Sequence, residues 1–417
     1  MSNSDEKLTN DSNSKHAFFD KKLDGLRAIC ALTVALGHVF YFRFFSAGGT
    51  AYNYIQFSRE AVLIFFIISG YVIGLHHIQT PFNYNNAVIY FKKRLVRLYP
   101  IYLLALIISF AIIFPVGFSL HQFIGHLFFT QEFLVKTVST NQALWSLSYE
   151  AVYYILFLGL WITNKHNIYI CLFLSVAISI YVIFSGHDIA IFGSVLIGWI
   201  FWMAGLYISQ QPIAASQSGS KRVLSPLISY FAVLLATNNL DTRGLVLRSL
   251  HLNLSHIYKI DFGDLVFLPV CALIVIDVTN RSVKFKNYLK IVVYAIPALH
   301  ILTLVYFKHP IYTNLSWEFG AFYFALAILM LPVKINPRWL EKLSYPGKIS
   351  YAVYVFHLPI AIIVDVFLGK YLSGMQFFVA GFITWAVVTI ALSVFTENIL
   401  QPHIKNYFFH KRKALQN

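Results

Sequence analysis

The feature that most constrains this chain is the recurrence of apolar runs long enough to cross a lipid bilayer. Hydrophobic residues make up 58% of its 417 residues and charged ones only 12%, whereas a soluble chain is about 25% charged. A membrane-spanning helix needs about 20 mostly apolar residues. The sequence therefore predicts an all-α, polytopic membrane bundle. Its ten to twelve transmembrane helices occupy apolar runs at about 26–45, 60–78, 99–116, 145–163, 167–185, 189–208, 222–237, 262–278, 289–307, 317–333, 350–369 and 376–396.

Basic residues are spread along the chain as short clusters in alternate connecting segments. The formal net charge is +15, but no soluble segment gathers it, so we do not expect nucleic acid as a partner. Cytoplasmic loops of membrane proteins carry an excess of Lys and Arg. We therefore expect both termini to be cytoplasmic, in an integral plasma (inner) membrane protein. We divide it into a disordered polar tail at 1–22, a membrane domain at 23–400 and a basic tail at 401–417.

The first apolar run carries a histidine deep inside it, His38, with Arg27 at the opposite end. The two residues are 11 positions apart, which places them about 16 Å apart along a helix and within about 20° of one face. Ionisable groups inside a membrane are expensive and are functional candidates. We predict a functional role for His38; the alternative is a packed core histidine beside an interfacial arginine.

The strongest basic cluster, YFKKRLVRLYP at 90–100, precedes the third run. Arg94 and Arg97 are three residues apart and project side by side on a helix, with Lys93 adjacent. Paired guanidinium groups suit bidentate binding of phosphate. The alternative is an ordinary positive-inside anchor that holds lipid headgroups.

The fourth run opens with LWSLSYEAVYY, which places Glu150 inside the membrane. A buried carboxylate needs a partner, and we expect Glu150 to lie at the depth of His38 and to contact it. The alternative is an acid near the helix start, stabilised by the helix dipole. We place four further residues in a substrate pocket: Ser69, Trp145, Tyr351 and His357. Ser69 adjoins the Gly70/Gly74 packing step, and His357 has the alternative of a core histidine bonded to a neighbouring helix.

Five segments in order resemble the acyltransferase 3 family of integral membrane acyltransferases, which modify envelope glycans and some secreted small molecules. They are LDGLRAICALTVALGH (23–38), FFIISGYVIG (65–74), FKKRLVRLYP (91–100), LWSLSYEAVYY (144–154) and ISYAVYVFHLP (349–359). The resemblance implies that His38 matches the essential membrane histidine of the family, Arg27 the arginine of its opening motif, Arg94 and Arg97 its arginine pair, and Glu150 its fourth-segment acid. The closing Glu-x-Pro motif of the family is stretched here, because Glu397 is separated from Pro402.

Residues and resemblance together predict a membrane O-acyltransferase. We expect it to take an acyl group, acetyl by default, from cytoplasmic acetyl-CoA. The acceptor is a hydroxyl of an envelope glycan or lipid-linked sugar on the outer side. His38 acts as general base or as acyl carrier, Glu150 assists it, and Arg27, Lys93, Arg94 and Arg97 bind the donor; no metal is expected. The alternative function is a secondary transporter or exporter of a glycan or acylated small molecule.

Overall fold

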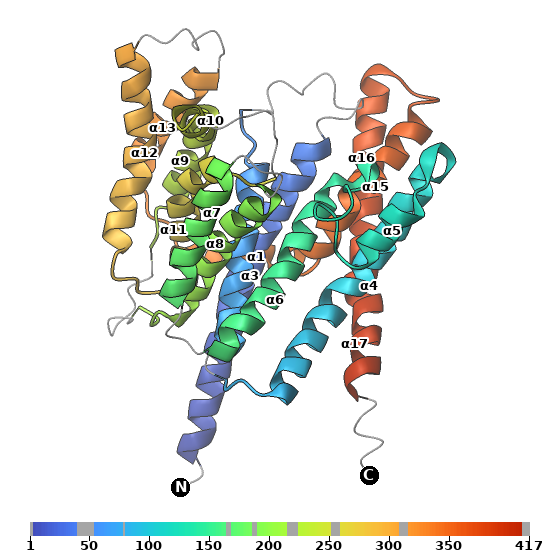
Figure 1. Cartoon of the computed structure of the whole chain (residues 1–417), viewed down its shortest axis with the longest axis horizontal. Coiled ribbons are helices and arrows are strands. Elements are labelled where there is room, and N and C mark those ends of the chain that lie inside the picture. The colour runs from blue at the N-terminus through green and yellow to red at the C-terminus, as the bar shows by residue number, and fades with distance from the viewer. Residues whose placement is uncertain are drawn as a thin grey trace.

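The computed structural model describes residues 3–39, 54–77, 80–163, 168–185, 190–214, 224–251, 259–307 and 316–410, and these form a helical bundle (Figure 1). The longer helices are α1 (Asn3–Val39), α3 (Ser58–His77), α4 (Tyr84–Gly117), α6 (Trp145–Thr163), α7 (Ile168–Ser185), α8 (Ala190–Gln210), α9 (Leu227–Asn239), α11 (Leu268–Thr279), α12 (Lys286–Phe307), α13 (Ser316–Met330), α15 (Ser350–Leu368), α16 (Gly374–Phe395) and α17 (Gln401–His410). Short helices complete it: α5 (Leu120–Leu127), η2 (Ser139–Leu144), α10 (Thr242–Ser249), η4 (Phe262–Phe267), η6 (Pro337–Leu343), α14 (Ser344–Lys348) and η7 (Thr396–Leu400).

The predicted fold class is confirmed, since each of the twelve apolar runs contains a helix. Within the described residues, eight helices are long and apolar enough to cross a membrane, and three shorter apolar helices accompany them. The first run continues past Val39 into residues 40–45, which lie outside the described residues. The protein is thus a multi-pass membrane protein.

The predicted boundaries of the two tails do not coincide with helix ends. Helix α1 begins at Asn3, within the tail expected to be disordered, and α17 extends to His410, within the basic tail. Residues 1–22 contain neither Gly nor Pro, so a helix that is stabilised by packing further along can continue into this polar segment. The end of the basic tail, 411–417, lies outside the described residues.

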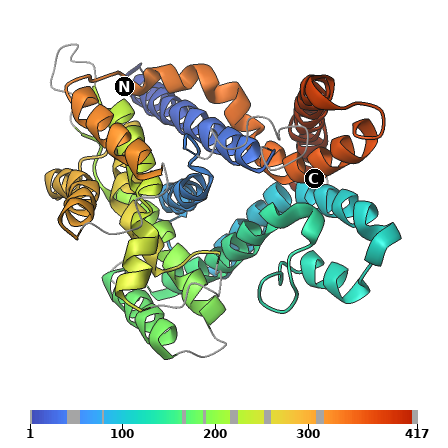
Figure 2. The same ribbon diagram turned by 90° about the horizontal axis from the view of Figure 1, so that it is seen from above.

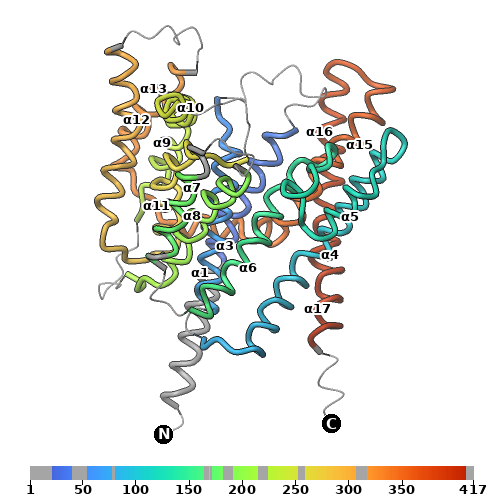
Figure 3. Tube along the Cα trace, in the orientation of Figure 1, coloured from blue at the N-terminus to red at the C-terminus, as the bar shows by residue number. Residues whose placement is uncertain are grey.

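Helix α3 occupies the centre of the bundle (Figure 2), where it contacts α1, α8 and α11. Helices α7 to α13 lie on one side of it, and α4, α5, α15, α16 and α17 on the other (Figure 1). The coloured part of α1 begins, and α17 ends, toward the same end of the molecule (Figure 3). That both termini are cytoplasmic stays a prediction.

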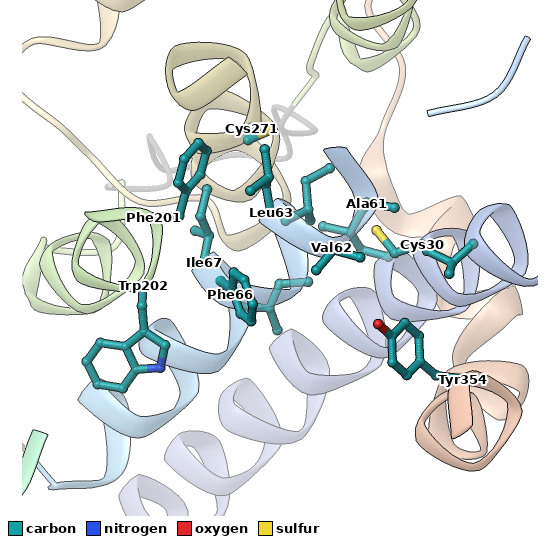
Figure 4. Packing of buried hydrophobic residues seen from close by; sticks show 14 of the residues in the cluster. Cys30, Ala61, Val62, Leu63, Phe66, Ile67, Phe201, Trp202, Cys271 and Tyr354 are labelled. Carbon is teal, nitrogen blue, oxygen red and sulfur yellow. The ribbon is translucent and has the colours of Figure 1, made fainter. Parts of the chain in front are cut away.

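The core is built on close contact between α3 and α8. Figure 4 shows Leu63, Phe66 and Ile67 of α3 between Cys30 of α1 and two aromatic residues of α8, Phe201 and Trp202. The backbones approach so closely that a Cβ at Gly70 would lie 1.9 Å from the Trp202 carbonyl oxygen. One at Gly205 would lie 1.8 Å from that of Ile67. Small residues permit such contact between membrane helices, as expected for Gly70.

Prolines inside the described helices leave backbone carbonyls without their usual partner, and at two of them, Pro100 and Pro359, a distant side chain binds the freed carbonyl. Pro100 cannot donate to the Val96 oxygen in the preceding turn, and the Gln401 side chain donates to that oxygen at 2.7 Å. Pro359 likewise frees the Val355 oxygen, which accepts from Asn141 Nδ2 at 2.9 Å. Unpaired backbone groups are costly in a membrane. These bonds therefore fix α17 against α4, and η2 against α15.

We predict that Gly205→Ala destabilises the protein by about 1–3 kcal/mol, because the new methyl group meets the backbone of α3. Gly159→Ala on α6 is the matched control, since a Cβ there has nothing within 4 Å. Comparing the two removes the general effect of Gly→Ala on helix propensity. The measurement is thermal unfolding in detergent; equal melting temperatures for the two variants would contradict the packing account.

Candidate active site

A cavity of about 370 Å³ opens between α1, α3, α4, α6, α14 and α15. Six of the ten residues predicted for the site line it, although they come from five different helices: Arg27, Ser69, Arg94, Arg97, Glu150 and Tyr351. Asp24, Tyr154, Lys348 and Tyr354 are among the other lining residues. The fold therefore converts separate sequence motifs into one polar cavity.

The cavity is lined by more cations than anions. Arg27, Arg94, Arg97 and Lys348 face two carboxylates, those of Asp24 and Glu150. Lys348 reaches this position because α14 packs directly on α1, where a Cβ at Gly347 would lie 1.9 Å from the Asp24 carbonyl oxygen. The excess of positive charge suits an anionic ligand.

The two arginines of α4 differ in how they are held. Arg97 Nη1 lies 2.5 Å from Glu397 Oε2, and its guanidinium lies 5.5 Å from the centre of the Tyr351 ring. Arg94 forms no ion pair with the described residues; its guanidinium lies 5.7 Å from each of the Tyr90 and Tyr154 ring centres, and its buried Nε has no hydrogen-bond partner. Arg94 is therefore the arginine of the pair with more capacity to bind a ligand.

Glu150 is held by hydroxyl groups inside the same cavity. Its Oε1 accepts hydrogen bonds from Ser69 Oγ at 2.9 Å and from Tyr154 OH at 2.5 Å. Trp202 Nε1 donates to Ser69 Oγ at 3.3 Å. Ser69 therefore orients a carboxylate and does not serve only helix packing.

The expected contact between Glu150 and His38 is wrong, because the two residues lie at different depths. His38 follows Gly37, which packs against Ser58 at the start of α3. Glu150 instead bonds to Ser69, 11 residues further along α3. Eleven helical residues correspond to about 16 Å. Glu150 thus lies at the depth of Arg27, with which it shares the cavity.

The partner of His38 is His357. His38 Nδ1 lies 2.9 Å from His357 Nε2, and the two rings are parallel to within 9° with centroids 5.1 Å apart. His357 is fully buried, and its carbonyl oxygen accepts from Trp385 Nε1 at 2.9 Å. Neither histidine lines the cavity, but Tyr354 does, and its ring centre is 6.0 Å from that of His357. Tyr354 therefore connects the cavity wall to the histidine pair.

Two further predicted residues lie outside the cavity. Lys93 is exposed on α4. Trp145 packs edge-on against Phe66 and Tyr149. Conversely, Asp24, Tyr154 and Lys348 line the cavity without having been predicted for the site, and Glu397 was expected only as part of a closing motif. Two of these residues had a local signal on one helix face. Tyr154 lies four residues from Glu150, and Asp24 lies three residues from Arg27, with which it forms an ion pair at 3.1 Å.

Within the described part of the chain, no group of three or more His, Cys, Asp or Glu side chains is placed to hold a metal ion.

The fold and the cavity define a multi-pass membrane protein with a cationic site at the depth of Arg27. The family model described as an acyltransferase domain, that of the acyltransferase 3 family, matches residues 20–396. The match covers nearly the whole chain, so the chain belongs to this family and is a membrane acyltransferase. No curated protein and no solved structure matches the chain.

We predict that Arg97→Gln lowers stability by about 1–3 kcal/mol, because it leaves the Glu397 carboxylate, which is only 5% exposed, without its partner. The double variant Arg97→Gln/Glu397→Gln removes both charges and is expected to recover at least half of the loss. Thermal unfolding of the single and double variants in detergent measures this. A double variant no more stable than Arg97→Gln would show that the pair does not hold α4 to η7.

Proposed function

We propose that the protein transfers an acyl group, acetyl by default, from acyl-CoA to a hydroxyl of an envelope glycan or lipid-linked sugar. The observation that carries this proposal is the convergence of Arg27, Arg94, Arg97 and Lys348 on one cavity. Coenzyme A carries several phosphates, and guanidinium groups bind phosphate in a bidentate manner. The donor enters from the cytoplasm, and the acceptor from the outer side of the plasma membrane.

In this proposal the donor extends from the arginines toward His38. Arg27 and His38 are separated by about 16 Å along α1, a distance comparable to an extended pantetheine arm. The thioester passes Tyr354, the cavity residue that contacts His357. Glu150 lies at the depth of Arg27 with hydroxyl partners on Oε1. Its carboxylate is therefore assigned to amide N–H groups of the pantetheine arm and not to His38.

The chemistry proposed for His38 is proton transfer at one ring nitrogen. The neutral imidazole takes the proton of the acceptor hydroxyl while the oxygen attacks the thioester carbon. The carbon–sulfur bond then breaks, and the leaving thiolate receives that proton. General base catalysis of this kind contributes about 10² to 10⁴-fold. A two-step route, in which His38 carries the acyl group covalently, uses the same nitrogen as nucleophile.

The test is an assay with protein purified in detergent, radiolabelled acetyl-CoA and extracted envelope glycans. An acyltransferase forms labelled glycan without any membrane gradient, whereas a transporter moves solute only in sealed vesicles. Mass spectrometry of envelope glycans from cells with and without the protein then identifies the acceptor. Absence of labelled product with glycans from the native cell would overturn the proposal.

We predict that Arg94→Lys raises the KM for acetyl-CoA about five-fold or more, because it keeps the positive charge but loses the guanidinium fork, at about 1 kcal/mol per lost bond. Arg281→Lys is the matched control. Arg281 lies outside the cavity, and it donates to Tyr71 OH and the Gln211 carbonyl oxygen. The KM of each variant for acetyl-CoA is measured by steady-state kinetics with varied donor at saturating acceptor. An unchanged KM for Arg94→Lys would return Arg94 to the role of a topology anchor.

We predict that His38→Ala reduces kcat by about 10²-fold or more, because the proton acceptor is lost. Membrane insertion remains intact, since the substitution only makes the first span more apolar. Turnover by the variant is compared with wild type after both have been extracted from the membrane in equal yield. Retained turnover would remove His38 from the proposed mechanism.

A further inference from the structure

The hydrogen-bond contacts of the His38–His357 pair indicate which ring nitrogens carry hydrogen. His38 Nδ1 faces His357 Nε2 at 2.9 Å. On the other side of the His357 ring, Nδ1 lies 3.3 Å from the carbonyl oxygen of Val353, one turn earlier in α15. No carboxylate of the described residues is hydrogen-bonded to either ring. The pair is therefore a chain of two imidazoles that ends on a backbone carbonyl.

The carbonyl determines which nitrogen of His357 carries hydrogen. A carbonyl oxygen can only accept, so Nδ1 of His357 must be the donor to Val353. The same Nδ1 contact with the carbonyl one turn earlier recurs at His76, His126 and His403, at 2.7–2.8 Å. A neutral imidazole has one N–H group, and a buried imidazolium without a carboxylate partner is costly. Nε2 of His357 is thus an acceptor.

The tautomer of His357 in turn determines the tautomer of His38. Because Nε2 of His357 accepts, Nδ1 of His38 must be the donor in the 2.9 Å contact. The single N–H of neutral His38 is thereby placed on Nδ1, and its Nε2 retains a lone pair. The opposite tautomer would place the bare Nδ1 of His357 against the Val353 oxygen. Two acceptors would then face each other at 3.3 Å.

We propose that His357 is a positioning residue that holds His38 in the Nδ1–H tautomer and so makes His38 Nε2 the reacting nitrogen. The proposal rests on the proposed function, and it applies to both direct transfer and an acyl-histidine route, since each needs a lone pair on Nε2. It also replaces the role that the sequence analysis gave to Glu150. Orientation of an imidazole by a partner at its other nitrogen is the logic of catalytic triads.

The surroundings hold His357 in place by contacts that do not involve its ring. The carbonyl oxygen of His357 accepts from Trp385 Nε1. Two residues away, Asn141 binds the Val355 oxygen freed by Pro359. On the facing helix, Ser58 Oγ donates to the Thr33 oxygen at 3.1 Å. Both backbones are therefore fixed at the depth of the pair, as a preorganised site requires.

In the transfer step, His38 Nε2 takes the proton of the acceptor hydroxyl, the new carbon–oxygen bond forms, and the carbon–sulfur bond breaks. Nδ1 of His38 keeps its hydrogen bond to His357 Nε2 throughout. The proton on Nε2 then passes to the leaving thiolate. The products are an ester and free coenzyme A thiol, and both histidines return to their starting tautomers.

Two amide substitutions at position 357 distinguish the roles of the two ring nitrogens of His357. In His357→Gln the side-chain oxygen reaches the position of Nε2 and can accept from His38. In His357→Asn the amide reaches only the position of Nδ1 and can bind only Val353. Both variants introduce a polar amide into the same buried site, so they are matched in their general cost to folding.

We expect His357→Gln to keep kcat within about five-fold of wild type. We expect His357→Asn to lose about 10²-fold in kcat with the KM for acetyl-CoA unchanged. A purely structural role would lower the kcat of both variants together. Equal kcat values for Gln and Asn, in proteins with equal melting temperatures, would overturn the proposal. If the melting temperatures of the two variants differ, a third variant, His357→Leu, is compared with them at an assay temperature below all three melting temperatures. We expect His357→Leu to lose as much kcat as His357→Asn. A His357→Leu protein as active as His357→Gln would also overturn the proposal.

The outcome is distinguishable from failure of the proposed function by including His38→Ala. If His38→Ala is active, the proposed function of the site is wrong. If His38→Ala is inactive and the His357→Gln and His357→Asn variants have equal kcat values, only the proposed role of His357 is wrong. His300→Asn is the control for loss of a buried histidine elsewhere, since His300 contacts Thr242 at 2.9 Å outside the site; its kcat is expected to match wild type.

Discussion

The structure depends on the requirement that every backbone carbonyl inside a membrane finds a donor. Pro100 and Pro359 each break that rule within their own helix, and each break is repaired by an amide side chain from far along the chain. The repair at Pro100 brings Gln401 onto α4, and Glu397, one turn earlier in a π-helical segment, then reaches Arg97. The repair at Pro359 fixes α15 two residues from His357. The two prolines therefore locate both a cavity arginine and the buried histidine.

The site divides by depth into a charged part and a neutral part. Arginines, a lysine and two carboxylates gather where the cavity opens, whereas the histidine pair is bounded by a backbone carbonyl and aromatic rings. The division follows from electrostatics. Phosphate binding needs fixed positive charge, but a cation beside an imidazole opposes its protonation. Placing Arg27 about 16 Å from His38 along the axis of α1 allows both requirements to be met in one bundle.

What could be predicted from the sequence was set by local periodicity. Each of the twelve apolar runs of bilayer length contains a helix, and helical spacing put Arg27 and His38 on one face of α1. The Gly70 step correctly indicated close packing, because small residues leave a local signal. The pairing of Glu150 with His38 failed because it required the relative depth of α6 and α1, which no local pattern encodes. The Arg97–Glu397 pair joins residues 300 positions apart. In the sequence, Glu397 stood out only as part of the stretched closing Glu-x-Pro motif.

An imidazole that is oriented by another imidazole behaves differently from one oriented by a carboxylate. A carboxylate supplies a permanent negative charge that stabilises imidazolium before the substrate arrives, whereas neutral His357 supplies only a hydrogen-bond acceptor. In the proposed reaction, positive charge on His38 is therefore balanced by the substrate alone, first by the oxygen of the attacked thioester and then by the leaving thiolate. Both charges form and disappear within one step, in a site where an unpaired charge is costly. Proton return to the thiolate is then tightly coupled to carbon–sulfur cleavage. Such coupling favours direct transfer to the acceptor over a long-lived acyl-histidine, because an acylated His38 holding its Nδ1 proton would remain cationic with no counter-charge beside it.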